Sequence, residues 1–278
     1  MKNKNYFQDQ AYLQSSQYKD STNLDARASL HRRFSTANVE WQSWVFDRMQ
    51  LMPGSRVLEC GCGPGWLWRS NIDRIPPDCQ ITLTDLSSGM VAEATAALAA
   101  TGHHFVCQTA NIEELPFADN AFDVVVANHM LYHVPDLDKA LREIKRVLSE
   151  NGRFLAATNG NNHMKEIPEF GQALFAQETA VLADTRLNRD GTFFLSFRLE
   201  NGAELLAPYF AQIDLYNYAD SLRVTEVPPL VAYILSTIDA AKITDDIVTR
   251  LTDYLEQKLT ADGVIKISKA TGLFVCQP

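Results

Sequence analysis

One loop in the sequence has the glycine spacing of a nucleotide-binding site. The apolar run Val57–Cys60 leads directly into Gly61-Cys62-Gly63-Pro64-Gly65. Glycine is needed where the backbone must adopt a positive φ or where a ligand contacts the main chain. A helix is expected to begin just after the loop, and the crevice at this place in an open α/β sheet binds ligands. The loop therefore predicts a ligand site at the carboxyl end of a strand.

An acidic residue follows the second predicted strand, at the place where a ribose could bind. Asp85 follows the second apolar run, Gln80–Thr84, and lies 20 residues beyond Gly65. Its side chain can accept hydrogen bonds from both ribose hydroxyls, and such charge-assisted bonds are stronger than neutral ones. A glycine turn followed by an acidic residue also arises by chance between a strand and a helix. Taken together, however, the loop and Asp85 predict an adenosine-binding site.

Nicotinamide-dependent oxidoreductases also bind a ribose through an acidic residue. Their fingerprint spaces the glycines as GxGxxG. Gly61, Gly63 and Gly65 follow the pattern GxGxG instead. The spacing therefore disfavours NAD as the cofactor.

Three of the six histidines, His129, His133 and His163, lie close together in the sequence. Imidazole titrates near neutral pH, so His129 and His133 are candidates for a catalytic base. Both also have a structural interpretation, in which His129 packs beside a bound cofactor and His133 caps the following turn with Pro135. The sequence leaves these two interpretations open.

The five cysteines are odd in number and form no CxxC pair. They are Cys60, Cys62, Cys79, Cys107 and Cys276. Most lie inside apolar runs, which favours free thiols in a reducing cytoplasm. A structural zinc ion needs about four ligands, and no second cluster accompanies Cys60 and Cys62, so we predict no metal site.

Short apolar runs alternate with helical patterns between residues 55 and 159. Helices are expected where Ser87 and Asp136 can cap amphipathic segments. Strands are expected at Arg56–Cys60, Gln80–Thr84, His104–Cys107, Phe122–Ala127 and Arg153–Thr158. This alternation predicts an α/β fold: a Rossmann-like, seven-stranded, mostly parallel sheet with helices on both faces.

The segments on either side of this core are expected to be mainly helical and to form a lid. Residues 1–54 should form an N-terminal helical cap, in which Ser35 and Thr36 could cap a helix whose apolar stripe is Trp41, Trp44, Val45 and Met49. Residues 160–278 should complete the sheet and carry acceptor-binding insertions. Their predicted helices lie near 168–184, 200–210, 229–237 and 244–260, their predicted strand near 212–218, and a closing strand or hairpin at 264–268 and 273–276. We expect one integrated domain.

Composition argues against several classes of partner. The 278 residues include 25 Lys and Arg and 34 Asp and Glu, a formal net charge of -9. This charge repels phosphate backbones, so nucleic acid is not an expected partner. No apolar run approaches the ~18 residues of a membrane span, and the polar N-terminus lacks the apolar core of a signal peptide. We therefore expect a soluble, cytoplasmic protein.

Four blocks carry a resemblance to a known family. The blocks are LECGCGPG, TDLSSGM, ANIEELPFADNAFDVVVANHMLYHVPD and ALREIKRVLSENGRFLAAT, and they span roughly residues 54–159. In order and spacing they resemble the UbiE-like, Methyltransf_11 branch of the class I methyltransferases. The resemblance implies that the cofactor is S-adenosyl-L-methionine and that the reaction is methyl transfer.

The resemblance also assigns residues to the methionine part and the ribose of the cofactor. The position of Glu59 binds the amino group, usually through water. Asp85 stands where the family holds the ribose, and Asn128 and His129 line the methionine end. The loop beneath the methionine portion corresponds to Gly61, Cys62, Gly63 and Gly65.

Adenine contacts follow from the same resemblance, with one departure. Leu86 and Met90 flank the ring, and the backbone N–H of Ile112 donates to a ring nitrogen. Asn111 occupies a position that usually carries Asp, whose oxygen accepts from the adenine amino group. An amide can present an oxygen there, but it lacks the charge, so weaker adenine recognition is expected.

The acceptor is expected to be a small molecule. After the fourth strand the chain reads Asn128-His129-Met130-Leu131 rather than the Asn/Asp-Pro-Pro-aromatic turn of enzymes that methylate amino groups of nucleic acids and proteins. The methylated atom and the oligomeric state stay open. A protein that binds the cofactor as a sensor or partner, without catalysis, is the alternative.

Overall fold

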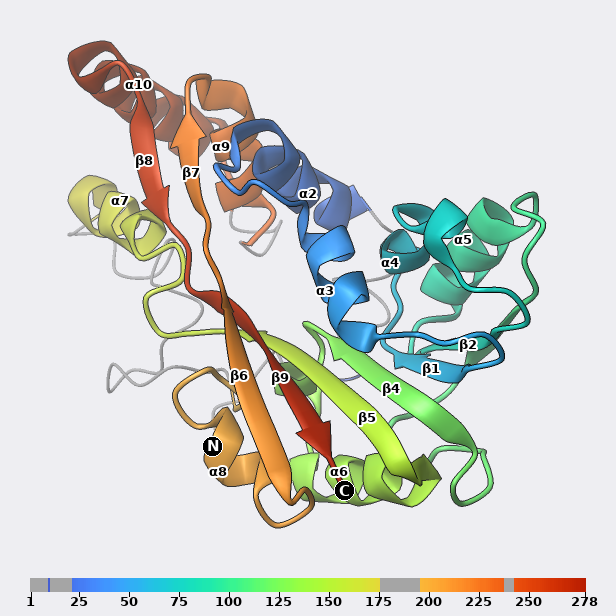
Figure 1. The fold of residues 1–278 in the computed structure, drawn as a ribbon. Coiled ribbons are helices and arrows are strands. Elements are labelled where there is room, and N and C mark those ends of the chain that lie inside the picture. The colour runs from blue at the N-terminus through green and yellow to red at the C-terminus, as the bar shows by residue number, and fades with distance from the viewer. Residues whose placement is uncertain (1–9, 11–21, 176–195, 238–242) are drawn as a thin grey trace.

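The computed structural model describes residues 10, 22–175, 196–237 and 243–278 (Figure 1). Its centre is a seven-stranded sheet of order β3-β2-β1-β4-β5-β9-β6. Strands β1 to β5 are parallel, and β9 runs antiparallel to both of its neighbours. The strands are β1 (Arg56–Cys60), β2 (Gln80–Asp85), β3 (Phe105–Thr109), β4 (Phe122–Asn128), β5 (Leu148–Asn159), β6 (Gln212–Tyr218) and β9 (Thr271–Gln277). This confirms the predicted fold class.

Helices cover both faces of the sheet because its central strands are apolar on both sides. Leu58 and Val125 point into one core, which α6 (Leu137–Val147) and α8 (Gly202–Leu206) cover. Val57 and Val124 point into the other core. That second core is covered by α3 (Trp41–Met49), α4 (Trp66–Arg69) and α5 (Ser88–Leu98). Short 3-10 turns lie at Ile72–Arg74 and Leu131–His133.

Two of the predicted helix starts are confirmed and one is wrong. The Ser87 side chain accepts a hydrogen bond from the backbone of Met90, and that of Asp136 accepts one from Lys139. Helix α3, by contrast, begins after Glu40, which makes no side-chain cap. Ser35 and Thr36 do not cap α3, because their hydroxyls bind residues of a distant strand connection.

The C-terminal residues do not form the hairpin that was one of the two expectations. Strand β8 (Ile265–Ser268) pairs with β7 (Ser221–Val224), while β9 pairs with β5 and β6. As Figure 1 shows, β6 continues into β7 and β8 into β9, so one antiparallel ribbon leaves the sheet. The helices α7 (Glu166–Phe175), α9 (Val227–Leu235) and α10 (Asp245–Asp262) follow the fifth and sixth strands of the sheet, as predicted. The predicted 168–184 helix is described as far as Phe175, and its residues 176–184 lie outside the described part of the chain.

A third core holds these helices against α2 (Thr22–Phe34) and the β7–β8 ribbon. Leu30 and Phe34 of α2 are buried in it together with Leu230 of α9 and Leu255 of α10. We call this unit of α2, α7, α9, α10, β7 and β8 the cap. Figure 1 shows its helices gathered at one end of the molecule, around β7 and β8.

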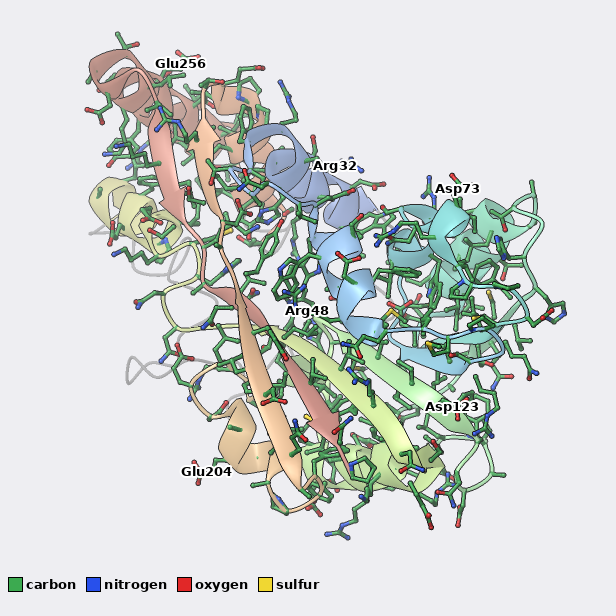
Figure 2. All side chains as sticks on the ribbon, viewed as in Figure 1. Arg32, Arg48, Asp73, Asp123, Glu204 and Glu256 are labelled. Atoms are coloured by element: carbon green, nitrogen blue, oxygen red, sulfur yellow. The ribbon has the colours of Figure 1, made fainter. Side chains whose placement is uncertain are left out.

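Charged side chains lie mainly on the outside. Figure 2 shows Asp73, Glu204 and Glu256 on the periphery, and all three are exposed. In the described ranges, no helix has both the length and the apolarity needed to cross a membrane.

The ribbon bends at a buried ion pair. Asp220, between β6 and β7, binds Lys269, between β8 and β9, and their side chains are 0% and 8% exposed. The Asp220 carboxylate also accepts four hydrogen bonds of 2.7–3.1 Å, from the Ser35 hydroxyl and from the backbone N–H groups of Thr36, Ala37 and Ser221. It therefore fastens the α2–α3 connection to both strands of the ribbon.

We expect Asp220→Ala to lower the free energy of unfolding by about 3–5 kcal/mol, because it leaves the Lys269 ammonium buried without its counter-ion. Urea unfolding measures the change. The matched control is Glu226→Ala, which removes the carboxylate of an exposed pair with Arg33 between the same parts of the chain. That variant should lose no more than about 1 kcal/mol. Equal losses in the two variants would contradict the role given to Asp220.

Candidate functional site

A cavity of about 1060 Å³ lies between the sheet and the cap. It opens at the carboxyl ends of β1, β2 and β4, where ligands bind in open α/β sheets. Its volume is at the upper end of the range for one small-molecule site, so it has room for a nucleoside and a second small molecule. Among its lining residues are twelve predicted ones: Glu59, Gly61, Cys62, Gly63, Asp85, Leu86, Met90, Asn111, Ile112, Asn128, His129 and His133.

The glycine loop adopts the left-handed backbone that its sequence predicts. Gly61, Gly63 and Gly65 have φ of 68°, 52° and 75°. A Cβ on Gly61 would lie 2.8 Å from the side chain of Met130, so this position admits no larger residue without movement. Gly65 is not among the residues that line the cavity; a Cβ there would point toward Leu98 of α5. The structure therefore gives Gly65 a part in the turn and its packing.

The Asp85 carboxylate is hydrogen-bonded to the glycine loop, with which it was predicted to form one site. Its two oxygens accept hydrogen bonds from the backbone N–H groups of Gly63 and Ser87, at 2.9 and 2.8 Å. The backbone N–H of Leu86 also acts on this carboxylate. A carboxylate offers about four acceptor positions, so Asp85 can still accept from a ligand hydroxyl. Burial raises the pKa of Asp85, and the backbone N–H groups partly offset this.

Glu59 lies at the end of β1 with only 2% of its surface exposed. Its Oε2 accepts a hydrogen bond of 2.7 Å from the indole N–H of Trp68. Burial raises the pKa of Glu59 to about 8, opposed by the Trp68 bond and reinforced by the charge of Asp85. A cation beside such a buried carboxyl lowers its pKa, because the cation stabilises the ionised form.

The Asn111 side chain is fixed by its own loop. Its Oδ1 accepts a hydrogen bond of 3.0 Å from the backbone of Glu113, and one lone pair of the oxygen stays available. The neighbouring apolar side chains of Ile112 and Met90 are 6% and 1% exposed. All three residues line the cavity, so they offer a heterocycle apolar contacts and one polar acceptor.

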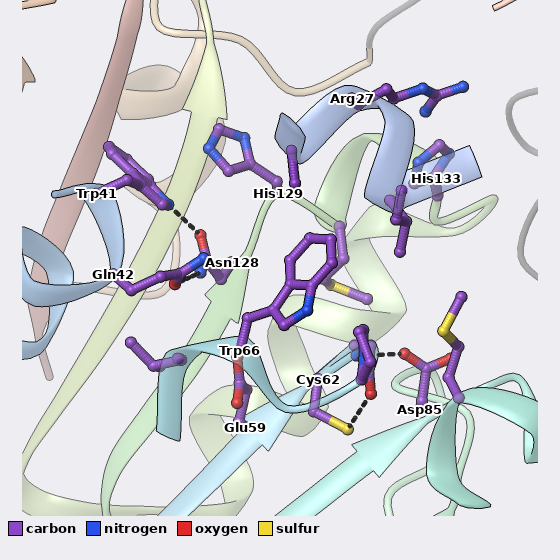
Figure 3. Close-up of a pocket in the computed structure, with 18 of the residues that line it drawn as sticks. Arg27, Trp41, Gln42, Glu59, Cys62, Trp66, Asp85, Asn128, His129 and His133 are labelled. Carbon is purple, nitrogen blue, oxygen red and sulfur yellow. Dashed lines mark hydrogen bonds between the residues drawn. The ribbon is translucent and has the colours of Figure 1, made fainter. Parts of the chain in front are cut away.

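Two residues of α3 belong to the site although the sequence indicated only their place on an amphipathic helix. The indole N–H of Trp41 donates to Asn128 Oδ1 at 3.2 Å, and Asn128 Nδ2 donates to Gln42 Oε1 at 3.4 Å. Figure 3 shows both bonds at the end of β4. An indole N–H that is buried needs a hydrogen-bond acceptor. This requirement is the feature of the sequence that could have indicated a polar neighbour for Trp41.

Trp66, the residue after the glycine loop, also contributes to the cavity. Its indole projects between Cys62 and His129 in Figure 3, and it is one of the lining residues. Beside it, burial raises the pKa of the Cys62 thiol well above its ordinary value. Cys62 is therefore a neutral, small side chain and not a nucleophile.

Both histidines predicted as candidate bases reach the cavity, and the cap adds others. His129 has a left-handed backbone with φ of 59°, and burial followed by the charge of Lys269 lowers its pKa to about 3. His133 packs edge-on against Tyr132 at 4.6 Å between ring centroids. His163 accepts from or donates to the Thr271 hydroxyl at 3.1 Å. His31 of α2 was not predicted, because nothing in its helix places it beside β4.

Metal ligands are not grouped in the described part of the chain: no cluster of three or more His, Cys, Asp or Glu side chains there could hold an ion. The site's chemistry is thus that of a nucleoside pocket joined to a second pocket under the cap. The cap side is lined by Arg27, His31, Tyr218, Asp220, Tyr233 and Lys269.

Comparison with known proteins identifies the core. A family model described as a methyltransferase domain, Methyltransf_11, matches residues 58–156. The chain is 30% identical to the malonyl-acyl-carrier-protein O-methyltransferase of Legionella pneumophila over 139 residues, 49% of this chain and 48% of that protein. It is 38% identical to the ubiquinone/menaquinone biosynthesis C-methyltransferase UbiE of Vibrio campbellii over 120 residues, 41% and 45% of the two chains. Residues 58–156 therefore form a methyltransferase domain of this family.

A solved structure shares the fold of this chain. It is phosphoethanolamine N-methyltransferase 2 of Haemonchus contortus in complex with S-adenosyl-L-methionine, with a TM-score of 0.59 and 20% identity, covering 98% of this chain and 60% of that one. The chain spans about half the length of the curated relatives it matches. All elements of the cap lie outside the matched family region, so the ligand of the cap must be inferred from the structure.

The residues of the cavity suit S-adenosylmethionine in their charge and in the access they leave. Gly61 and Gly63 leave the main chain open to a ligand, and the Asp85 carboxylate lines the same cavity. Buried Glu59 would be ionised by the cationic amino group or sulfonium. When bound, the cofactor would supply an activated methyl group.

The pKa of Glu59 predicts a pH-dependent stability. Glu59 ionises near 4.5 when unfolded and near 8 when folded, so between these values the folded state binds more protons and the free energy of unfolding falls as the pH rises. The glutamine of the Glu59→Gln variant cannot ionise. In urea unfolding, the variant should have a free energy of unfolding close to that of the parent near pH 4.5 and a higher one than the parent near pH 8.

The matched control for this experiment is Glu143→Gln. Arg146 lowers the pKa of Glu143 through a hydrogen bond, so the stability that this carboxylate contributes is lost at acid pH and not as the pH rises. Its replacement should shift stability by the same amount at both pH values. Parallel pH profiles for Glu59→Gln and the parent would contradict the protonated state of Glu59.

Proposed function

We propose that this protein transfers the methyl group of S-adenosylmethionine to a small molecule bound under the cap. One observation carries the proposal: a single cavity joins the glycine loop, Asp85 and Glu59 to a second region lined by the cap. The first region suits the donor nucleoside, and the second has space for an acceptor. The five free cysteines are consistent with the cytoplasm as its location.

The residues that contact the cofactor are part of the proposal. Asp85 holds the ribose hydroxyls, and Glu59 pairs with the amino group. Asn111 Oδ1 and the backbone N–H of Ile112 bind the adenine edge, with Leu86 and Met90 on its faces. The methionine part lies over Gly61, Cys62 and Gly63, and Asn128 and His129 close its end.

Alignment is the main contribution that the protein makes in this reaction. A sulfonium is already an activated donor, so holding the nucleophile in line with the methyl group supplies much of the acceleration. Trp41 and Gln42 hold Asn128 from the side of α3, while α2 covers the cavity from the cap. These contacts fix the donor end and exclude water from it.

A small acceptor agrees with the shape and charge of the protein. The cap covers the carboxyl edge of the sheet, and the net charge of -9 disfavours nucleic acid. The relatives named above are an O-methyltransferase and a C-methyltransferase, so their names leave the methylated atom open.

Cofactor choice is tested by calorimetry with S-adenosylmethionine, its demethylated product S-adenosylhomocysteine, and NAD. We expect the two sulfur nucleosides to bind and NAD to give no signal. Asp85→Ala should lose on the order of 1.5–3 kcal/mol of binding, as for removal of a charge-assisted hydrogen-bonding group. Asp123→Ala is the control, since Asp123 pairs with Arg56 outside the cavity. Binding of NAD alone would refute the assignment.

The adenine contact is tested separately at Asn111. Asn111→Ala should weaken binding of S-adenosylhomocysteine by roughly 1–3 kcal/mol, because the adenine amino group loses its acceptor. Asn111→Asp keeps an oxygen for both Glu113 and adenine and adds a charge, so it should bind equally well or more tightly. An alanine variant that binds like the parent would remove Asn111 from the site.

Catalysis itself separates an enzyme from a sensor that only binds the nucleoside. The parent protein is incubated with S-adenosylmethionine and a small-molecule extract of the cells that encode it. We expect S-adenosylhomocysteine to be released only when the extract is present. Binding without release under these conditions would favour the sensor.

A further inference from the structure

The side chain of Asn128 is held between two residues of α3. The indole N–H of Trp41 donates to Asn128 Oδ1 at 3.2 Å, and Asn128 Nδ2 donates to Gln42 Oε1 at 3.4 Å (Figure 3). Asn128 ends β4, and all three residues line the cavity. The proposed cofactor contacts place Asn128 at the methionine end, so the direction in which its amide points decides what it offers to the ligand there.

Trp41 sets this direction. An indole N–H can only donate, whereas the amide of Asn128 has an oxygen that accepts on one side and an NH₂ group that donates on the other. The atom that meets Trp41 must therefore be the oxygen. Turning the amide over would bring its NH₂ group against the indole N–H, and leaving donors without an acceptor in a half-buried place costs free energy.

The indole of Trp41 is itself held by three rings. It stacks on Trp44 at 5.3 Å between ring centroids, and it lies 5.0 Å from His129. Tyr218, the last residue of β6, meets it edge-on at 5.1 Å. The donor that orients the amide is thus fixed from α3 and from two strand ends of the sheet.

One hydrogen of Asn128 Nδ2 is left for a ligand. The nitrogen carries two hydrogens, and among the described residues only Gln42 accepts one of them. The side chain of Asn128 is half-buried and lines the cavity, while its oxygen is engaged by α3. The end of β4 therefore offers the ligand an N–H donor.

The methionine end of S-adenosylmethionine carries an ammonium and a carboxylate. Buried Glu59 suits the ammonium, because a cation stabilises its ionised form. The carboxylate only accepts hydrogen bonds, and such charge-assisted bonds are stronger than bonds between neutral groups. The free N–H of Asn128 therefore matches the carboxylate.

We propose, building on the function proposed above, that Trp41 is a positioning residue for the cofactor. It turns Asn128 so that the amide N–H binds the carboxylate of the methionine part, while Gln42 holds the other hydrogen of the same NH₂ group. Helix α3 lies outside the matched family region, so this recognition is a property of the chain beyond the family's motifs.

The test measures the preference for a carboxylate by calorimetry with two ligands. One is S-adenosylhomocysteine, and the other is its decarboxylated analogue, whose side chain ends in the amine alone. The parent should bind S-adenosylhomocysteine more tightly than the analogue, by about tenfold or more. Trp41→Phe keeps a ring but removes the N–H, so the amide can turn.

In Trp41→Phe, affinity for S-adenosylhomocysteine should fall by about three- to tenfold, while affinity for the analogue changes little. A merely structural role of Trp41 would weaken both ligands alike. The matched control is Trp44→Phe, which alters the neighbouring ring. The indole of Trp44 makes no hydrogen bond to Asn128 and does not line the cavity, so this variant should keep the parental preference.

Asn128→Asp tests the same inference without touching the aromatic cluster, and it decides the matter if Trp41→Phe does not fold. Aspartate keeps an acceptor for the Trp41 N–H but has no N–H of its own. Its charge repels a carboxylate and attracts an amine. The preference should therefore reverse, with the analogue binding more tightly than S-adenosylhomocysteine.

Other results overturn the inference in distinguishable ways. Equal losses for both ligands in Trp41→Phe, or a parental preference in Asn128→Asp, would remove the carboxylate contact. Arg69, an exposed residue of the cavity lining, is a second possible donor. A preference lost in Arg69→Gln but kept in Trp41→Phe would assign the carboxylate to Arg69 instead. If the parent binds neither ligand, the proposed function fails and this inference fails with it.

Discussion

The buried ion pair between Asp220 and Lys269 is the constraint on which the cavity depends. It sits where the β6–β9 pair leaves the main sheet and becomes the β7–β8 ribbon. Since the same carboxylate accepts hydrogen bonds from residues 35–37, the connection between α2 and α3 is tied to this point. The pair thereby fixes the cap, the sheet and the N-terminal helices relative to one another at the rim of the ligand site.

The two sides of the cavity are built from different parts of the chain. On the sheet side, the loop after β1, the end of β2 and the end of β4 lie next to each other, because parallel strands end at one edge. The cap side is assembled from α2, α9 and the bend of the ribbon, which are distant in sequence. The named relatives match the core, and their names give different reactions, an O-methylation and a C-methylation.

Burial sets the electrostatics of the site in both halves. It raises the pKa of Glu59 to about 8 and lowers those of His31 and His129 to about 3, so all three groups are largely neutral near pH 7 without a ligand. A cation at Glu59 reverses that preference on the donor side. Strong pKa shifts concentrated in one cleft are typical of functional sites, and the three groups here line the same cavity.

The sequence by itself determined the sheet, the glycine loop and most of the residues that line the cavity at the ends of β1, β2 and β4. These depend on local patterns: apolar strands, caps at Ser87 and Asp136, and glycines that precede a helix. Only the tertiary structure decided that Gly65 faces α5, that the chain ends in a ribbon and not a hairpin, and that Ser35 binds Asp220. It also brought His31 into the cavity and Trp41 to the end of β4. Such contacts join segments up to about 200 residues apart, and no local periodicity records which distant strand or helix will satisfy a buried polar group.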